Sequence, residues 1–174
     1  MITRSALGLS TVPGPEPIVL EALFVLEAVA PGELHVERFL PPTPVRVLVS
    51  NRCEEVKSNL GKLGNAPVAS VLGKSDLGYK LFPRMLEQAE RMAESRSTQI
   101  VAGGLRAMQT ALGAEVERLK DLRAINPNVR QSEIDQAQKQ IYDLRDHLAE
   151  ARVRLDSVRL IFRASRGAAG LMGA

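Results

Sequence analysis

The chain has few aromatic residues and almost no cysteine. Phe, Trp and Tyr make up 3% of its 174 residues, and Trp is absent. Binders of single-stranded nucleic acid depend on stacking bases against aromatic rings, so this composition argues against that class of protein. A single cysteine, Cys53, cannot form an internal disulfide, which predicts a reducing, cytoplasmic setting.

Long apolar runs and a strong net charge are also missing. The longest apolar run, at 22–26, is far shorter than the roughly 20 residues of a transmembrane helix, so we expect no contact with a membrane. The first residues lack a secretory leader pattern, and 2–9 read as ordered structure, which predicts a fragment of a longer protein. The net charge of +3 permits an anionic partner without predicting one.

Residues with the right chemistry for catalysis or metal binding are scattered. His35, His147 and Cys53 are the strongest candidates for soft metal ligands, and no two of them have the spacing of a metal site. Gly73-Lys74-Ser75 resembles the end of a phosphate-binding loop, but Val68 stands where that loop needs a glycine. We therefore predict no catalytic residue, no metal and no cofactor in this chain.

The first third of the chain predicts a small antiparallel sheet. Residues 2–9 form a candidate first strand. Apolar residues occupy every even position from 20 to 30, and this period of two predicts a second strand with one buried face. Glu, Ala and Leu within that stretch also suit a helix, and local propensity does not decide between the two.

Proline and glycine mark how this sheet continues. Pro31 and Gly32 fit the centre of a tight turn, and the apolar residues within 34–39 predict a returning strand. The alternating valines of 44–50 predict the clearest strand of the chain. Residues 51–76 are rich in Gly, Ser and Asn and predict a long loop.

A first long helix is predicted over 77–125. Apolar residues follow helical spacing along this stretch. The helix starts either at residue 77 or near Phe82, which would place Pro83 in the tolerated first turn. Gly103-Gly104, two neighbours with poor helix propensity, predict a kink.

A second helix is predicted over 129–166. The first helix ends before Pro127, and Asn128 or Ser132 supplies the new N-terminal cap. Apolar residues recur in steps of three and four over 134–162, which is the pattern of a heptad seam. Such a narrow stripe needs a partner, so the two helices should lie antiparallel as a hairpin.

These elements predict an α+β fold. A small antiparallel sheet (1–50) packs with the helical hairpin in a single domain over 1–166, and 167–174 form a flexible tail. A monomer follows if the seam is covered within the chain. The alternative is a free-standing coiled-coil protein whose seam pairs with a second copy.

One set of arginines is a candidate docking strip. They recur every seven residues, with one neighbour, along one flank of the predicted second helix: Arg145, Arg152, Arg159, Arg163 and Arg166. Ion pairs with nearby carboxylates are the simpler explanation of such a flank. The alternative is a strip that docks on an acidic protein face or on the phosphate backbone of DNA or RNA.

Four segments together carry a family resemblance. They are LFVLEAVAP at 23–31, RFLPPTPVR at 38–46, LRAINPNVR at 122–130 and LDSVRLI at 155–161. In this order they resemble the C-terminal domain of the RapA (HepA) family, which consists of bacterial RNA polymerase-associated ATPases. The resemblance covers most of the chain, from about residue 2 to 162.

This resemblance implies a function that the residues alone do not give. Members of the family are Swi/Snf-type DNA translocases that bind RNA polymerase and use ATP to recycle it during transcription. Their helicase-like motifs, which bind ATP and Mg, lie upstream of the segment that resembles this chain. The resemblance therefore implies a non-catalytic terminal module that packs against the rest of a RapA-like ATPase and contacts polymerase or nucleic acid.

Overall fold

The structure, a computed structural model, describes residues 4–10, 14–57, 60–61, 63–65 and 80–163. The chain divides into two compact units, and each is described by itself. The sheet unit comprises Met1–Val25, Pro44–Ser95 and Arg154–Ala174, and the hairpin unit comprises Leu26–Thr43 and Arg96–Val153. That residues 1–166 fold as one cooperative domain stays a prediction.

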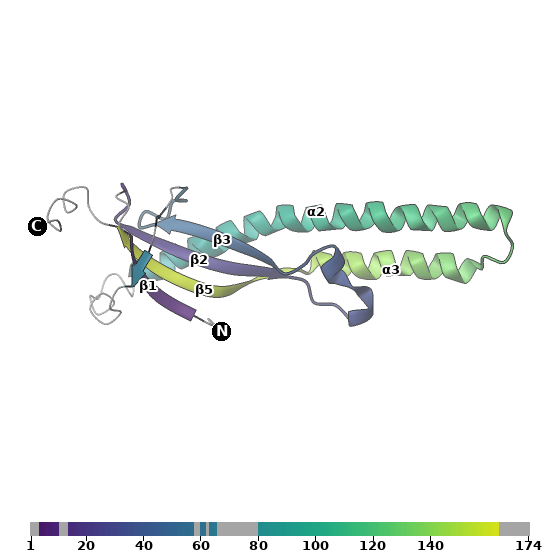
Figure 1. Ribbon diagram of the computed structural model, residues 1–174, viewed down its shortest axis with the longest axis horizontal. Helices are drawn as coiled ribbons and strands as arrows, with labels where there is room; N and C mark the ends of the chain where they lie inside the picture. The colour runs from purple at the N-terminus through teal and green to yellow at the C-terminus, as the bar shows by residue number, and fades with distance from the viewer. Residues whose placement is uncertain (1–3, 11–13, 58–59, 62, 66–79, 164–174) are drawn as a thin grey trace, which may run out of the picture. The chain divides into compact units, whose positions relative to one another are not determined.

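A five-stranded sheet is the centre of the sheet unit (Figure 1). Its strands, in the spatial order β3-β2-β5-β1-β4, are β1 (Arg4–Ser10), β2 (Ile18–Glu27), β3 (Thr43–Ser50), β4 (Leu63–Asn65) and β5 (Arg152–Arg163). β1 runs parallel to β5 and antiparallel to β4. The predicted α+β class and the strands expected at 2–9, 18–30 and 44–50 are confirmed.

Backbone hydrogen bonds give the direction of the strands beside β2. The N–H of Asn51, which follows β3, donates to the carbonyl of Ile18, the first residue of β2. The N–H of Arg163, the last residue of β5, donates to the carbonyl of Pro17, just before β2. The ends of β3 and β5 therefore meet the start of β2, and both strands run antiparallel to it.

The period of two predicted for β2 separates its two faces. Its even residues Leu20, Ala22, Phe24 and Leu26 are at most 1% exposed, whereas the odd residues from 21 to 27 are half-buried. Side chains alternate across a strand, so the even residues share one face, which we call the inner face of the sheet. The first turns of α2 (Phe82–Ile125) add Met85, Ala89 and Ala93, all fully buried, to the same unit.

The largest error of the sequence prediction lies in β5. The helix expected over 129–166 ends at residue 149, because α3 covers Gln131–Ala149 and is followed by the strand Arg152–Arg163. β5 lies between β2 and β1 in the middle of the sheet. Apolar residues on both of its faces satisfied the helical spacing as well, and pairing with two strands distant in the sequence decides in favour of the strand.

The returning strand expected at 34–39 is also wrong. This segment forms two single turns of 3₁₀ helix, η1 (Gly32–Leu34) and η2 (Val36–Arg38), which are joined at His35. The backbone of His35 is left-handed, with φ of 48°, so the chain reverses there instead of extending. Val36 and Leu40 are buried, which explains the apolar pattern without a strand.

The predicted helical hairpin forms the core of the hairpin unit. α2 and α3 are joined by a short turn and pack along each other (Figure 1). Their buried apolar residues within the hairpin unit are Met108 and Val116 on α2 and Ile134, Ile141, Leu144 and Leu148 on α3. The apolar stripe of α3 is therefore covered within one chain, which disfavours the alternative of a seam that pairs with a second copy.

The observed ends of the two helices agree only in part with those predicted from the sequence. α2 begins at Phe82 with Pro83 in its first turn, and residues 77–79 lie outside the described residues. Neither Asn128 nor Ser132 caps α3, since the cap position is Arg130 and no side chain bonds there. The Asn126 side chain instead accepts a hydrogen bond of 3.0 Å from the N–H of Asn128 and closes the turn.

Gly103 and Gly104 have unequal surroundings in the hairpin unit. α2 continues through both residues. A β-carbon on Gly104 would lie 2.8 Å from the carbonyl oxygen of Phe39, whereas one on Gly103 would meet no atom within 4 Å. Gly104 thus allows the backbone after η2 to approach the helix closely, which is a reason for glycine other than the predicted kink.

Candidate functional site

The arginines of the predicted docking strip do not lie on one element of the structure. Arg145 lies on α3, while Arg152, Arg159 and Arg163 lie on β5, and Arg166 lies outside the described residues. A common helix flank is therefore wrong. Because side chains alternate along a strand, Arg152 points to the face of β5 opposite Arg159 and Arg163. The docking role of these arginines remains a prediction.

Arg145 occupies an exposed position with local partners. Its guanidinium donates from Nε and from a terminal nitrogen to Oδ1 of Asp146, at 3.1 and 3.0 Å, and lies 5.4 Å from the centre of the Tyr142 ring. The arginine and aspartate side chains are both more than half exposed. Water screens an ion pair of this kind, so it contributes little to the fold.

Arg145→Ala should change the free energy of unfolding by less than about 0.5 kcal/mol, because the pair is exposed. Urea denaturation followed by circular dichroism measures this change. A larger loss would mean that the contact with Tyr142 stabilises the hairpin unit more than its exposure indicates.

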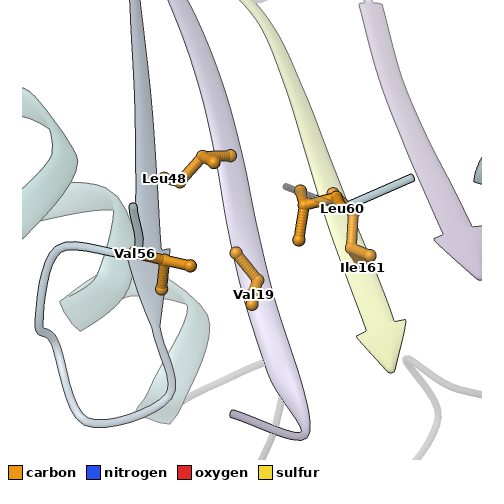
Figure 2. Close-up of a cluster of buried hydrophobic side chains, with 5 residues drawn as sticks. All are labelled: Val19, Leu48, Val56, Leu60 and Ile161. Atoms are coloured by element: carbon orange, nitrogen blue, oxygen red, sulfur yellow. The ribbon is translucent and has the colours of Figure 1, made fainter. Parts of the chain in front are cut away.

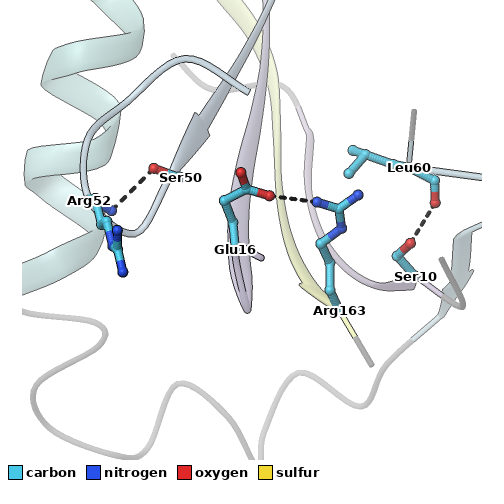
Figure 3. Close-up of polar contacts among 6 residues, drawn as sticks. All are labelled: Ser10, Glu16, Ser50, Arg52, Leu60 and Arg163. Carbon is cyan, nitrogen blue, oxygen red and sulfur yellow. Dashed lines mark hydrogen bonds and ion pairs between the residues drawn. The ribbon is translucent and has the colours of Figure 1, made fainter. Parts of the chain in front are cut away.

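Arg163 is a structural residue of the sheet unit. Its side chain is 2% exposed, and its guanidinium donates a hydrogen bond of 2.7 Å to Glu16 (Figure 3). Its backbone N–H bonds to Pro17, and a β-carbon on Gly14 would overlap the guanidinium. Arg163 therefore fastens the segment before β2 to the end of β5, and a buried guanidinium of this kind is not a surface for a partner.

Arg159 belongs to a cluster of charges across three strands. Its NH1 atom lies 3.5 Å from one carboxylate oxygen of Glu21 on β2, and Arg46 Nε on β3 donates to the other oxygen at 2.7 Å. Glu21 is 17% exposed, and the arginines are 43% and 56% exposed. Two guanidinium groups thus share one carboxylate.

The sequence contained a signal for this cluster. Glu21 occupies an odd position of β2, on the face opposite its even apolar residues, and Arg46 stands between two inward-facing valines of β3. Period two thus places each residue on the outward face of its own strand. The sequence pattern did not reveal the strand β5, so Arg159 was assigned to a helix.

An apolar cluster covers one end of the same face. Val19, Leu48, Val56, Leu60 and Ile161 are buried together (Figure 2). Leu48 accepts a backbone bond from Val56, and Ser10 donates its hydroxyl to the carbonyl of Leu60 (Figure 3). Residues 51–57 and Leu60 therefore cover this end of the face.

Charges on α2 are paired locally. Arg118 donates two hydrogen bonds to Glu115, and these bonds lower the pKa of the Glu115 carboxyl. Lys120 bonds to Glu117 in the same way, at 2.7 Å. Glu115 and Glu117 are thus paired within their own helix.

The remaining chemical candidates gain no support. Gly73-Lys74-Ser75 lies outside the described residues. Within the described part of the chain, His, Cys, Asp and Glu side chains never gather in a group of three that could hold a metal ion. No described helix combines the length and the apolar character needed to cross a membrane.

Comparison with known proteins gives a consistent family. A model of the RNA polymerase recycling family, C-terminal, matches residues 5–163. The proteins named RNA polymerase-associated protein RapA from Vibrio cholerae, Haemophilus influenzae (strain PittEE) and Vibrio parahaemolyticus are 35%, 33% and 32% identical to the chain. Each match covers 83% of this chain but 16% of the relative, so the chain spans about a sixth of their length.

Proposed function

Because the chain belongs to the RNA polymerase recycling family, as its C-terminal domain, we propose that it is a non-catalytic docking module of an RNA polymerase-associated protein. The observation that carries this proposal is the extent of the family match. Apart from Arg4, the first residue of β1, residues 5–163 include the five described strands and both long helices, so the likeness involves the whole fold and not one motif.

The proposed parent protein supplies the chemistry. It is an ATP-dependent, Swi/Snf-type translocase whose ATP and Mg bind upstream of this module, and it works on polymerase in the cytoplasm. The module packs against the rest of that ATPase and helps to hold the machine on polymerase. Relatives about six times longer than the region they share support such a division of labour.

Only some arginines of the docking strip contribute to this function. Arg145, Arg152 and Arg159 retain partly or fully exposed positions from which they contact an acidic protein surface or a nucleic-acid backbone. Arg163 is excluded because its side chain is buried. A mild net charge of +3 favours an acidic protein surface, since binders of a nucleic-acid backbone usually carry many uncompensated cations.

Direct binding to polymerase tests the proposal. Purified bacterial core RNA polymerase is immobilised, and the 174-residue chain is added in solution while binding is followed by interferometry. We expect saturable binding that weakens as salt is raised, because charged groups at the rim of an interface steer association. ATP hydrolysis by the chain should stay at the level of the buffer, with or without polymerase. Absence of saturable binding, or ATP turnover by this chain alone, would contradict the proposal.

A further inference from the structure

The turn between α2 and α3 exposes a large apolar side chain (Figure 1). Ile125, the last residue of α2, is 82% exposed, and every residue from 123 to 128 is exposed. At this exposure Ile125 adds little to the stability of the hairpin unit. Single exposed aliphatic residues are common on protein surfaces, so the charges around Ile125 decide whether this one has a role. We call residues 122–131 the hairpin tip.

Two arginines flank Ile125 in the hairpin tip. Arg123 lies in the last turn of α2, and Arg130 is the residue before α3. Both are exposed, and neither guanidinium has a hydrogen bond or ion pair with another residue that the structure describes. The tip contains no acidic residue and therefore carries two positive charges. The nearest carboxylates in the sequence, those of Asp121 and Glu133, lie further along the two helices.

Many other cations of the hairpin unit are already neutralised. Four of them have a carboxylate partner on their own helix: Arg118, Lys120, Lys139 and Arg145. A cation that is paired within its helix has to break that contact before it binds a partner. Arg123 and Arg130 have no such contact to lose, so the tip offers its charge to an anionic group more readily than the sides of the hairpin do.

Hydrogen bonds hold the tip in one shape. The N–H of Asn126 donates to the carbonyl of Leu122 at 2.8 Å, and the N–H of Val129 donates to the carbonyl of Asn126 at 3.2 Å. The Asn126 side chain accepts the bond from Asn128, and Pro127 restricts the backbone between them. A turn that is ordered before binding loses little conformational entropy on binding, which favours its use as a docking element.

We propose that the hairpin tip docks on RNA polymerase, with Ile125 in an apolar pocket and Arg123 and Arg130 against carboxylates at the rim of that pocket. This inference rests on the proposed function and names the surface that carries it out. A phosphate backbone would pair with the arginines but offers nothing apolar to cover Ile125. An apolar centre with a polar, charged rim is the usual composition of a protein interface.

Replacement of the apolar side chain is the first test, made in the whole chain. Ile125→Ser removes the group that would fill the pocket. Val29→Ser is the matched control, because Val29 is an aliphatic residue of the same unit and is 83% exposed. Both are measured against immobilised core RNA polymerase after thermal melts have established that each is folded. We expect Ile125→Ser to bind at least about tenfold more weakly, and Val29→Ser to stay within about twofold of the original chain.

Removal of the two charges is the second test. Arg123→Gln/Arg130→Gln should weaken binding at least about fivefold and make it less dependent on salt, because two ion pairs at the rim are lost. Arg84→Gln/Arg106→Gln lowers the net charge by the same amount at two exposed positions of α2 outside the tip. This control should keep both the affinity and the salt dependence of the original chain.

Crosslinking locates the contact without weakening it. A photo-crosslinking amino acid at Ala124, which is exposed beside Ile125, should form an adduct with a polymerase subunit on irradiation. The same group at Ala111, which is exposed on α2 outside the tip, should not. This measurement decides the matter if a variant fails to fold.

Each other outcome overturns the inference in a recognisable way. If the chain binds polymerase and the tip variants bind as well as their controls, or the group at Ala111 crosslinks in place of the one at Ala124, the docking surface lies elsewhere and the proposed function stands. If the group at Ala124 crosslinks to added duplex DNA and not to polymerase, the tip is a nucleic-acid site. If the original chain binds no polymerase, the inference and the proposed function fall together.

Discussion

Leu148→Ala is expected to lower the free energy of unfolding by about 2–5 kcal/mol, the range found when a large buried aliphatic side chain is truncated. Leu148 is fully buried on α3, with Leu144 and Ile141 on the same stripe. Its removal leaves a cavity in the hairpin unit that neighbouring helix turns fill only in part. The loss is read from urea denaturation followed by helical circular dichroism.

Leu155→Ala is the matched control for this measurement. Both residues belong to the apolar pattern of 134–162, but Leu155 lies on β5, where it is half-buried. Because part of its side chain already contacts water, its truncation should cost less than that of the fully buried Leu148. Equal losses for the two variants would contradict the assignment of 152–163 to the sheet.

Gly104→Ala should destabilise the chain by about 1–3 kcal/mol, the usual cost of adding atoms where there is no room. A β-carbon there would lie 2.8 Å from the Phe39 carbonyl oxygen, and because this oxygen belongs to the backbone the neighbouring chain has to shift. The better helix propensity of alanine offsets only about 1 kcal/mol of this loss.

Gly103→Ala should stabilise the chain, which is the opposite of the effect expected for Gly104→Ala. No atom lies within 4 Å of the new β-carbon, so we expect a gain of about 0.5–1 kcal/mol from helix propensity alone. Melting temperatures of both variants, measured side by side, test the pair. If Gly104→Ala stabilises as much as Gly103→Ala does, the close approach of Phe39 to α2 is wrong.

The helices and strands with one clear pattern were predictable. Period two with a clear inner face specified β2 and β3, and the seam from Ile134 to Leu148 specified α3. Pro127 fixed the place where the hairpin turns, because proline disfavours helical backbone in the residue before it. In these stretches local preference and tertiary burial agree, which is the condition under which sequence patterns succeed.

Prediction failed where one pattern fits two structures. The apolar residues of 152–163 fit a helical stripe, yet they also fit a strand that is buried on both faces. Arginines spaced by seven appeared to share a helix flank, but in the strand Arg163 is buried against Glu16 and Arg159 faces Glu21. The candidate site was therefore only partly predictable, since its arginines and their acidic partners come from separate segments of the chain.

The amino-acid sequence by itself determined the family, the α+β class, the hairpin turn and the alternating faces of the early strands, because each depends on residues close together in the chain. Only the tertiary structure decided that the last described segment is the strand between β1 and β2, and hence which arginines are buried and which face solvent. The physical reason is that a central strand takes its hydrogen-bond partners from distant parts of the chain, and no local pattern records that pairing.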